Sequence, residues 1–371
     1  MWFSNIKTGV ENYTENLVAS MLKHTEKCKF IIFTNQEAEL ELPTSERIEV
    51  VRLKAPIRRI GSEQWAIRGK MSEYNLELLH TPAFSAPIFY RGSQVLTIHD
   101  VAFLRYPQAV PKKVSIYMKL FMKLSVKQCS RIVTGSYFSR DEISTLFRKE
   151  PKNIEVIYNG VDYDFFNTTR QTELCDKRGN IIQNGYVLSV GSIEPRKNLS
   201  VLLEAYSRLS SSIRETHPLL FVGGHIWGSS QFNETIKRLD IDKNVVRLAF
   251  VPKALLPRIY QGASVFVYPS LYEGFGLPLI ESMASGTPVL CSNVSCIPEI
   301  VGDAALKIAP NPDNLFRSLE HILLSHDLVA ELREKGLRHA KKYNWDTTAL
   351  RMLKVYQGVI KDSHGLDNVV I

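Results

Sequence analysis

The sequence predicts an α/β protein made of two doubly wound, Rossmann-like domains in series, and three observations lead to this fold class. The chain has 371 residues, and about 150 residues per domain gives a prior of about two domains. Short apolar runs alternate with helical patterns throughout, which is typical of βαβ units and parallel sheets. Between the two halves, residues 167–185 are polar and end in an Asn-Gly pair, which indicates an interdomain linker.

The individual elements follow from these runs in chain order. The first helical pattern, Glu11–Leu22, starts so early that we expect the first sheet to lack its opening strand. The predicted strands are Phe30–Phe33, Ile48–Leu53, Leu76–Leu79, Val95–Ile98, Arg131–Thr134, Ile154–Ile157, Tyr186–Val190, Leu219–Val222, Val245–Leu248, Val265–Tyr268 and Pro288–Cys291. We therefore expect an N-terminal domain at residues 1–166 and a C-terminal domain at residues 167–345. Residues 346–371 are expected to form a helix that packs back on the N-terminal domain.

Composition argues against several protein classes. Hydrophobic residues make up 44% of the chain and charged residues 23%, which is ordinary for a globular protein. The five cysteines are scattered and form no C-x-x-C pair, which fits a reducing compartment and disfavours a disulfide framework or a zinc site. No signal peptide and no run of about 18 apolar residues is visible, so we expect a cytoplasmic location.

Positive charge is concentrated in the first half of the chain. The net charge is +8, and residues 50–135 hold 14 Lys and Arg against 4 Asp and Glu. This excess favours an anionic partner, and without a nucleic-acid-binding motif we do not expect nucleic acid. One stretch mixes lysines with apolar residues at helical spacing: Lys112, Lys113, Ile116, Lys119, Leu120, Phe121, Lys123 and Lys127. This pattern predicts peripheral docking on an anionic membrane surface, at the inner face of the membrane. The alternative is a helix that packs on the core and exposes a basic face to solvent.

The most specific segment follows a buried strand and reads Tyr-Glu-Gly-Phe-Gly-Leu-Pro-Leu-Ile-Glu. A helix is expected to begin here, so the N–H groups of Gly276 and Leu277 would form an anion-binding site beyond the strand ends. Glu273 and Glu281 can reach the same crevice and are suited to bind sugar and ribose hydroxyls. The alternative is that both carboxylates only favour the helix dipole.

Two further strand ends carry candidate residues. Arg196 and Lys197 lie where a helix begins and oppose its dipole, which an anionic ligand such as a diphosphate would explain; a solvated loop pair is the alternative. His99 follows a strand of the first domain and either faces a similar crevice or is a structural histidine. Gly9, before the first helix, could let backbone approach a phosphate or is a turn glycine.

Motifs for metals and cofactors are weak or missing. Asp162-Tyr163-Asp164 has a D-x-D spacing that could hold a divalent ion on a diphosphate, but it does not follow a strand in a crevice. Neither GxxxxGK[ST] nor GxGxxG occurs, which disfavours a P-loop NTPase or a dinucleotide dehydrogenase. We therefore expect no metal site and no cofactor.

Taken in order, these segments resemble the retaining glycosyltransferases of family 4, which have the GT-B fold. The resemblance runs from Gly9 to about Trp345. The matching stretches are TGVENYTENL, HTPAF, TIHDVAFLRYP, NGVD, GSIEPRKN, YEGFGLPLIESMASGTPV and PEIVGDAA. The resemblance implies two Rossmann-like domains that face each other across an interdomain cleft. The IEPRKN and HDVAFLRYP forms are similar to a subgroup that often uses GDP-mannose in cell-surface polysaccharide assembly.

The resemblance also implies a role for each matching residue. Glu281 would bind the ribose hydroxyls and Glu273 the transferred sugar. Arg196 and Lys197 would bind the diphosphate, and His99 would orient the donor sugar from the first domain. The other donor-binding residues implied are Gly9, Ser192, Val251, Phe275, Gly276 and Leu277. Many family members carry arginine at the position of Ser192.

The resemblance thus implies a metal-independent hexosyltransferase that moves a sugar, with mannose from GDP-mannose favoured, to a glycan or lipid-linked acceptor. The nucleotide diphosphate sugar is a co-substrate and not a cofactor. Cations and helix N–H groups would stabilise the leaving diphosphate, and the anomeric configuration would be retained. The alternatives are a GT-B phosphorylase or epimerase, and an inactive GT-B scaffold that binds partners.

Overall fold

The computed structural model describes residues 9–35, 40–53, 67–107, 112–168, 173–176, 179–224, 229–249 and 251–364. The chain divides into two compact units, residues 1–160 with 345–371, and residues 161–344. The first boundary lies before the predicted position at residue 166, because α6 (Tyr163–Asn167) packs on helices of the second unit. Val161 is fixed there as well, since its N–H donates to the carbonyl of Tyr343 at 3.0 Å.

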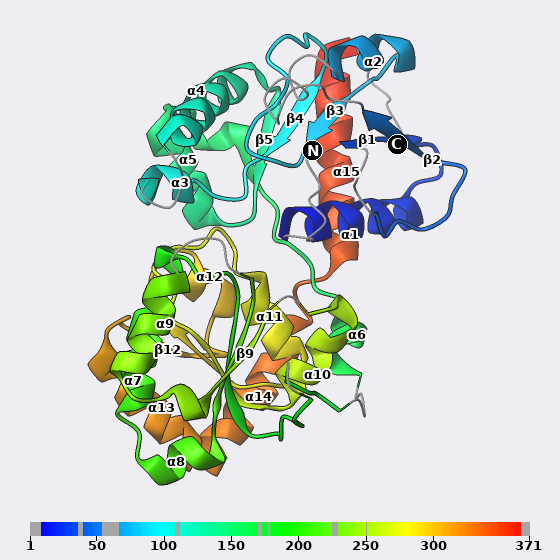
Figure 1. Cartoon of the computed structure of the whole chain (residues 1–371). Coiled ribbons are helices and arrows are strands. Elements are labelled where there is room, and N and C mark those ends of the chain that lie inside the picture. Colours follow the sequence, from blue (N-terminus) through cyan, green and yellow to red (C-terminus); the bar gives the residue numbers. More distant parts are fainter. Residues whose placement is uncertain are drawn as a thin grey trace. The chain divides into compact units, whose positions relative to one another are not determined.

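The first unit contains two parallel sheets, one with the order β1-β2 and one with the order β3-β4-β5-β6. Its elements are α1 Gly9–His24, β1 Phe30–Asn35, β2 Ile48–Leu53, α2 Ile67–Tyr74, β3 Leu79–Thr81, β4 Gln94–Thr97, α3 Ala102–Arg105, α4 Lys112–Gln128, β5 Arg131–Thr134, α5 Tyr137–Phe147, the 3₁₀ turn Pro151–Asn153, β6 Ile154–Val156 and α15 Trp345–His364. The four-stranded sheet carries α1 and α15 on one face and α4 and α5 on the other (Figure 1).

The terminal helix α15 is part of the first unit. It packs against α1, and the two helices bury a shared cluster on β4 and β5 that includes Tyr13, Leu17, Val95, Val133 and Met352. Apolar residues recur on α15 at helical spacing, so burial of this face stabilises the helix in its place. The amphipathic pattern at the end of the sequence therefore belongs to a core helix.

The second unit is built on one parallel sheet of six strands with the order β12-β11-β10-β7-β8-β9. Its elements are α6, β7 Tyr186–Val190, the 3₁₀ turn η4 Pro195–Lys197, α7 Leu199–Ser207, α8 Ser211–Thr216, β8 Leu219–Val222, α9 Ser229–Arg238, the 3₁₀ turn Asp242–Asn244, β9 Val245–Leu248, the 3₁₀ turn Lys253–Leu255, α10 Leu256–Gln261, β10 Ala263–Tyr268, α11 Leu277–Ala284, β11 Val289–Ser292, α12 Ile297–Val301, β12 Leu306–Ile308, α13 Pro312–Leu324 and α14 His326–Ala340. Helices α7, α9 and α13 cover one face, and α10 and α11 cover the other (Figure 1).

The strand order of the second unit places a crevice between β7 and β10. The chain starts at β7 and adds β8 and β9 on one side, then returns to add β10, β11 and β12 on the other. The loops that leave the carboxyl ends of β7 and β10 therefore run to opposite faces of the sheet. In open α/β sheets ligands bind at this reversal point.

The predicted α/β class with two doubly wound domains is confirmed, while one predicted strand is misplaced and one strand was not predicted. The predicted strand Leu76–Leu79 is found three residues later, at Leu79–Thr81, because Leu76 and Leu78 instead line a cavity of the first unit. The strand Leu306–Ile308 was not predicted, since it is three residues long and carries an exposed lysine at its centre. Short edge strands of this kind give no periodic signal.

Candidate active site

Backbone hydrogen bonds tie together the two loops that flank the crevice of the second unit. Arg196 and Lys197 lie on the 3₁₀ turn η4 after β7, and Asn198 then adopts a left-handed conformation (φ 56°) that starts α7. The carbonyl of Arg196 accepts from the N–H of Leu271 at 2.7 Å, and Asn198 Nδ2 donates to the carbonyl of Pro269 at 3.2 Å. The cationic turn is therefore held against the loop that carries Glu273.

Glu273 binds both cations of this turn. Lys197 Nζ donates to Glu273 Oε1 at 2.6 Å, and Arg196 Nη1 donates to Glu273 Oε2 at 2.9 Å. Lys197 also donates to the hydroxyl of Tyr268, the last residue of β10, at 2.9 Å. The Lys197 and Glu273 side chains are only 11% and 7% exposed, so these are charge-assisted bonds in a largely dry setting.

The ion pairs decide the charge states at this position. Burial alone would raise the pKa of Glu273, but the Lys197 ammonium and the Arg196 guanidinium outweigh it and lower the pKa to about 2. Burial lowers the pKa of Lys197, and the Glu273 carboxylate opposes that shift. Glu273 is therefore ionised throughout the physiological range.

A third carboxylate, Glu194, holds the guanidinium of Arg196. Arg196 Nε and Nη2 donate to the two carboxylate oxygens of Glu194 at 3.0 and 3.1 Å. Ser192, the expected donor-binding residue after β7, donates its hydroxyl proton to the same carboxylate. Arg196 thus lies between Glu194 and Glu273, while Lys197 is the cation that lines the cavity of the crevice.

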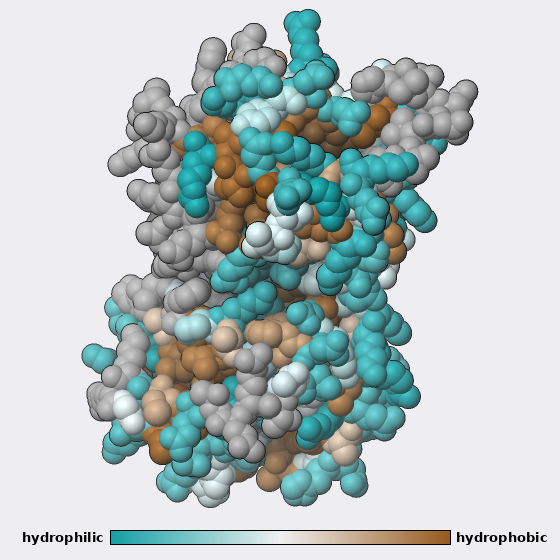
Figure 2. Space-filling view, turned by 90° about the vertical axis from the view of Figure 1, so that its right-hand side faces the viewer, coloured by the Kyte–Doolittle hydropathy of each residue, from teal (hydrophilic) through white to brown (hydrophobic). Residues whose placement is uncertain are grey.

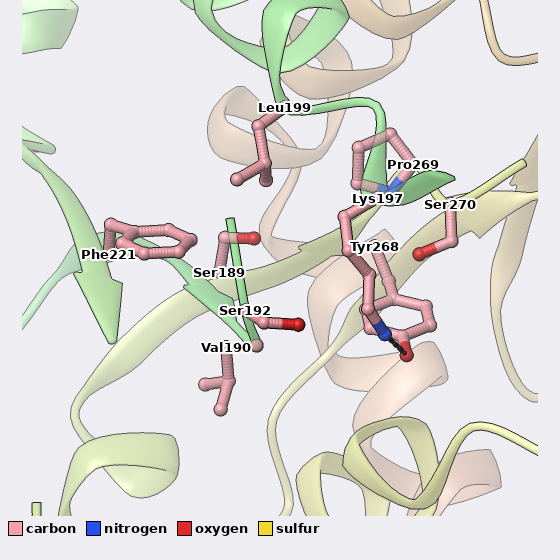
Figure 3. Close-up of a pocket in the computed structure, with 10 residues that line it drawn as sticks. Ser189, Val190, Ser192, Lys197, Leu199, Phe221, Tyr268, Pro269 and Ser270 are labelled. Carbon is pink, nitrogen blue, oxygen red and sulfur yellow. Dashed lines mark hydrogen bonds between the residues drawn. The ribbon is translucent and has the colours of Figure 1, made fainter. Parts of the chain in front are cut away.

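A small cavity of about 10 Å³ lies at the carboxyl ends of β7 and β10. Figure 3 shows Lys197 and Tyr268 on one side of it, joined by their hydrogen bond, with Ser189, Ser192 and Phe221 on the other. Gly191 lines this cavity and is in close backbone contact with Gly223, because a Cβ on Gly223 would lie 1.8 Å from the carbonyl oxygen of Gly191. Only glycine permits the loops after β7 and β8 to approach this closely.

Helix α11 begins beside the Glu273 loop. Gly276 precedes the helix with φ 90°, a conformation that favours glycine, and Leu277 is the first helical residue. No side chain caps this helix start; Pro278 has no N–H and the N–H of Leu279 donates to the carbonyl of Gly276, so the N–H groups of Gly276 and Leu277 are the ones that suit an anion here. Phe275 is buried, and its ring packs edge-on to Tyr343 with ring centroids 5.8 Å apart, so its side chain is held in the core of the unit.

Glu281 lies one turn into α11 and is bound to Tyr260 of α10. The Tyr260 hydroxyl donates to Glu281 Oε2 at 2.9 Å. Burial raises the pKa of Glu281, and this hydrogen bond partly offsets the rise. Glu281 is thus held by α10, whereas Glu273 is held by the cationic turn, so the two carboxylates occupy separate positions.

In the first unit, His99 follows β4 and is held by its surroundings. His99 Nε2 lies 3.2 Å from the carbonyl of Pro82, and the Tyr13 ring packs edge-on against the imidazole with centroids 4.8 Å apart. Burial lowers the pKa of His99, which Asp100 partly opposes. The imidazole is therefore favoured in its neutral form, fixed at the carboxyl end of a strand.

The remaining predicted residues lie in less defined surroundings. Gly9 is the first residue of α1, with no atom within 4 Å of where a Cβ would stand. Val251 is partly buried and precedes the 3₁₀ turn at Lys253.

Asp162, from the D-x-D pattern, caps α6 by accepting from the N–H of Phe165 at 3.0 Å, which accounts for it without a metal. Among the described residues no group of three or more His, Cys, Asp or Glu is placed to hold a metal ion.

Comparison with known proteins places the chain in a family. Residues 7–165 match the model described as Glycosyltransferase Family 4, and residues 173–339 match the model described as Glycosyl transferases group 1. The O-antigen chain mannosyltransferase B of Escherichia coli is 34% identical over 316 residues, which cover 84% of this chain and 80% of that protein. The chain belongs to glycosyltransferase family 4. The match spans both units, so it covers the cationic turn, the Glu273 loop and His99.

Two further similarities agree with this family 4 assignment. The O-antigen chain mannosyltransferase RfbU of Salmonella typhimurium is 29% identical over 267 residues, covering 72% of this chain and 70% of that one. The structure of HepE from Anabaena in complex with UDP-glucose superposes with a TM-score of 0.75 at 16% identity, covering 96% and 98% of the two chains. At that identity the structural match supports the GT-B fold alone.

Three residues of this glycosyltransferase site were missed by sequence reasoning: Glu194, Tyr260 and Tyr268. Glu194 stands two residues before Arg196, and an acid so close to an expected phosphate ligand could have indicated an internal ion pair. Tyr268 is the last residue of a strand whose final residues are buried in the core. Only its hydroxyl distinguishes it from the apolar residues before it. Tyr260 lies 21 residues before Glu281, and no local pattern joins the two.

Proposed function

We propose that this glycosyltransferase moves a mannosyl group from GDP-mannose, with retention of configuration, to a glycan or lipid-linked acceptor in cell-surface polysaccharide synthesis. The observation that carries the proposal is the Lys197–Glu273–Arg196 cluster at the carboxyl ends of β7 and β10, next to the uncapped start of α11. Cations and free N–H groups suit a diphosphate, and carboxylates suit the hydroxyls of a sugar nucleotide. The names of the two mannosyltransferase relatives support mannose as the sugar.

In the proposed reaction the bond between the anomeric carbon and the diphosphate oxygen breaks, and a bond from the acceptor oxygen to that carbon forms on the same face. The acceptor hydroxyl gives its proton to the departing phosphate oxygen, so the charges balance. Lys197 and the N–H groups at Gly276 and Leu277 stabilise the negative charge that develops on the diphosphate. Glu273 accepts from sugar hydroxyls, and Glu281 accepts from the ribose.

Calorimetry with GDP, UDP and ADP, followed by turnover with the matching sugar donors, tests the proposal. We expect GDP to bind most tightly and GDP-mannose to be turned over. Lys197→Ala should lower kcat/KM by about 100-fold or more, because a preorganised cation at the leaving group is lost. The control is Lys243→Ala, an exposed lysine of the second unit outside the site. Equal turnover by Lys197→Ala and wild type would overturn the assignment.

Product analysis separates the enzymatic alternatives. Proton NMR of the freshly formed glycoside should show the anomeric configuration of the donor, and the rate should persist in EDTA. Release of mannose 1-phosphate on addition of inorganic phosphate in place of acceptor would instead identify a phosphorylase. Absence of any nucleotide binding would identify a non-enzymatic scaffold.

We further propose that α4 docks the first unit on an anionic membrane surface. Ile116 is 69% exposed, Leu120 52% and Leu124 38%, and they form one apolar ridge at four-residue spacing. Lys119, Lys123 and Lys127 are exposed beside this ridge. The side chains of Lys112 and Lys113 lie outside the described residues. An apolar ridge next to a lysine row is the arrangement that inserts into a headgroup region. No described helix has both the length and the apolar character needed to cross a bilayer.

Liposome sedimentation tests this docking. The Lys119→Glu, Lys123→Glu, Lys127→Glu variant should lose most binding to vesicles that contain anionic lipid, because about 1 kcal/mol per lysine is removed and repulsion is added. The matched control reverses three exposed lysines of the second unit, Lys237, Lys243 and Lys342, and keeps the same net charge. Equal loss in both variants would show a dependence on net charge and not on α4.

A further inference from the structure

One residue beside the Glu273 loop has an unfavourable backbone conformation. Ser295 has φ 56°, in the left-handed region that glycine and asparagine adopt more readily than serine. It lies between the end of β11 at Ser292 and the start of α12 at Ile297. Strained residues persist where the surrounding structure holds them, and they gather at functional sites. A left-handed serine next to the candidate active site therefore points to a specific contact.

That contact joins the Ser295 hydroxyl to the main chain of Glu273. The N–H of Glu273 donates to Ser295 Oγ at 3.2 Å. Strands β10 and β11 are neighbours in the sheet, so the loops that leave their carboxyl ends lie side by side. The Ser292 hydroxyl donates to the carbonyl of Ser270 and gives these two loops a second link. The strained turn thus presents a hydrogen-bond acceptor to the Glu273 loop.

The Glu273 loop is therefore held from two sides, in two different ways. On the side of β7, Lys197 and Arg196 bind the Glu273 carboxylate. The carbonyl of Arg196 also accepts from the N–H of Leu271 at 2.7 Å. On the side of β11, Ser295 binds the N–H of Glu273. The cations hold the side chain of Glu273, whereas Ser295 holds the backbone from which that side chain extends.

This difference becomes important when a donor is bound. In the proposed function, diphosphate oxygens would take over the pairing with Lys197, and the Glu273 carboxylate would lose the shorter of its two ion-pair contacts. Its place would then depend on the main chain of Glu273. We propose that Ser295 is a positioning residue for the transfer step, which acts through the Glu273 N–H to keep the carboxylate at the hydroxyl groups of the donor sugar. This inference rests on the proposed function and adds to it a residue that does not itself contact the donor.

The alternative role for Ser295 is purely structural, because α12 begins two residues later. Two substitutions distinguish the roles. Ser295→Gly removes the hydroxyl and suits a φ of 56°, so the turn should form without strain. Ser295→Asn also suits this conformation and keeps a side-chain oxygen that can accept from the Glu273 N–H. The matched control is Asp240→Gly, since Asp240 is an exposed residue of the same unit with φ 52°.

The rate of GDP release from GDP-mannose, with water as the acceptor, tests the positioning role without an identified glycan. Water bonds to the anomeric carbon, the bond to the diphosphate oxygen breaks, and the proton goes to the phosphate. Ser295→Gly should lower kcat by about tenfold or more, because a displaced carboxylate no longer meets the sugar correctly. GDP affinity by calorimetry should be unchanged, since GDP lacks the transferred sugar.

The rescue and control variants decide between the two roles. Ser295→Asn should restore most of the lost kcat, and Asp240→Gly should match wild type. An unchanged kcat in Ser295→Gly, or an equal fall in both Ser295 variants, would overturn the inference. A parallel loss of kcat and GDP affinity would also overturn it, because that result indicates a general structural role.

Amide exchange gives a readout that depends on one bond and not on activity. Hydrophobic side chains are exposed on the first unit, on the side where α1, β1 and β2 lie (Figure 2). Thermal unfolding of the whole chain also reflects that unit, whereas the Glu273 amide reports the second unit alone. In protein with isotope-labelled glutamate, NMR should show this amide exchanging about tenfold faster or more in Ser295→Gly, with protection restored in Ser295→Asn. Equal exchange in wild type and Ser295→Gly would overturn the inference.

Failure of this inference can be told apart from failure of the proposed function. Wild-type protein that neither binds GDP nor releases it from GDP-mannose would overturn the proposed function, and this inference with it. Wild-type protein that does both, with the same kcat in Ser295→Gly, would overturn this inference alone.

Discussion

At the residue scale, Glu273 determines the state of the unliganded site. It accepts from Lys197 and Arg196 at 2.6 and 2.9 Å and keeps two nearly buried cations paired. A buried cation without its partner is strongly destabilising, so the carboxylate has a structural role in the absence of ligand. In the proposed function, diphosphate oxygens would take over the pairing with Lys197 and leave Glu273 to bind hydroxyl groups.

The first prediction is that Glu273→Gln lowers the free energy of unfolding by about 3–5 kcal/mol at pH 7, because Lys197 and Arg196 lose their shared partner. The pKa of Glu273 is lowered to about 2, against about 4.3 for an unfolded glutamate. Its contribution is therefore complete above about pH 4.3 and is lost as the pH falls toward 2. Urea titrations from pH 7 to pH 2 should show the two proteins converging in acid. The control Glu331→Gln breaks only an exposed pair with Lys335 and should change little at any pH.

The second prediction concerns the bond between Tyr260 and Glu281. Removing the hydroxyl with Tyr260→Phe takes away the group that opposes the raised pKa of Glu281, so the pKa should rise further and the ionised form should be less favoured. GDP affinity near pH 6 should fall by about 3–15-fold. This range corresponds to the loss of one hydrogen bond with a net contribution of about 1 kcal/mol or slightly more. Calorimetry measures this, with Tyr206→Phe, whose hydroxyl bonds to backbone carbonyls of the same unit, as the control. Equal affinity at all pH values would remove Glu281 from the nucleotide site.

The sequence predicted the acids and cations of the site better than their pairing. Lys197, Arg196 and Glu273 were assigned to one site, and the structure brings all three within hydrogen-bond distance. The assignment did not include the pairing of Arg196 with Glu194, because a local pattern gives residue types and not the rotamers that choose a partner. Tyr260 was missed for another reason: its contact with Glu281 exists only because α10 packs beside α11.

At the element scale, the close contact of the loops after β7 and β8 controls the shape of the crevice. Gly223 has φ 155°, and a Cβ there would meet the backbone of Gly191 at 1.8 Å. The collision is with backbone, so no flexible side chain can move aside. The two glycines let consecutive strand ends come together under the site.

The third prediction is that Gly223→Ala lowers the free energy of unfolding by about 2–4 kcal/mol, as overpacking at a strained position does. The displaced Gly191 loop should also weaken GDP binding, since it carries the turn with Lys197. The adjacent Gly224→Ala is a matched control, because no atom lies within 4 Å of its Cβ position. Thermal unfolding and GDP calorimetry of both variants measure the effect; equal behaviour would contradict it.

Elements with a full apolar period were predictable, and short ones were not. The strands Tyr186–Val190, Leu219–Val222 and Val245–Leu248 were predicted with the bounds that the structure has. Leu219–Val222 is a continuous apolar run, and the other two are apolar except for Ser189 and Arg247. The misplaced β3 has only three residues, and two leucines beside it face a cavity instead of a sheet. Where burial is not produced by sheet pairing, the apolar pattern misleads.

At the scale of the whole molecule, we expect the two units to respond differently to acid. His80 in the first unit bonds through its two ring nitrogens to Tyr356 of α15 and Thr97 of β4, at 2.6 and 2.8 Å. Burial, with a smaller effect of His99, lowers its pKa to about 3. The neutral imidazole thus joins the terminal helix to the sheet. It is harder to protonate in the folded unit than in the unfolded chain.

The fourth prediction is that the free energy of unfolding of the first unit falls between pH 7 and pH 5. That of the second unit should fall less over the same range. An unfolded histidine has a pKa of about 6.5, so the contribution of His80 is complete above that pH and is lost as the pH falls toward 3. At pH 5 the loss amounts to about 2 kcal/mol. Hydrogen exchange of β4 and α15 against β7 and β8 measures it unit by unit. His80→Asn should remove most of the difference, and equal weakening of both units would contradict the assignment.

The pairing of two acids with two bases in the crevice has a consequence for selectivity. Glu194 and Glu273 already neutralise Arg196 and Lys197, so the resting crevice presents little net potential to passing ions. Inorganic phosphate or sulfate would have to separate these pairs and has no hydroxyl-rich part to offer the released carboxylates. A sugar nucleotide offers both kinds of group together. For the proposed sugar-nucleotide donor, these ion pairs would therefore favour the donor over the abundant small anions of a cell.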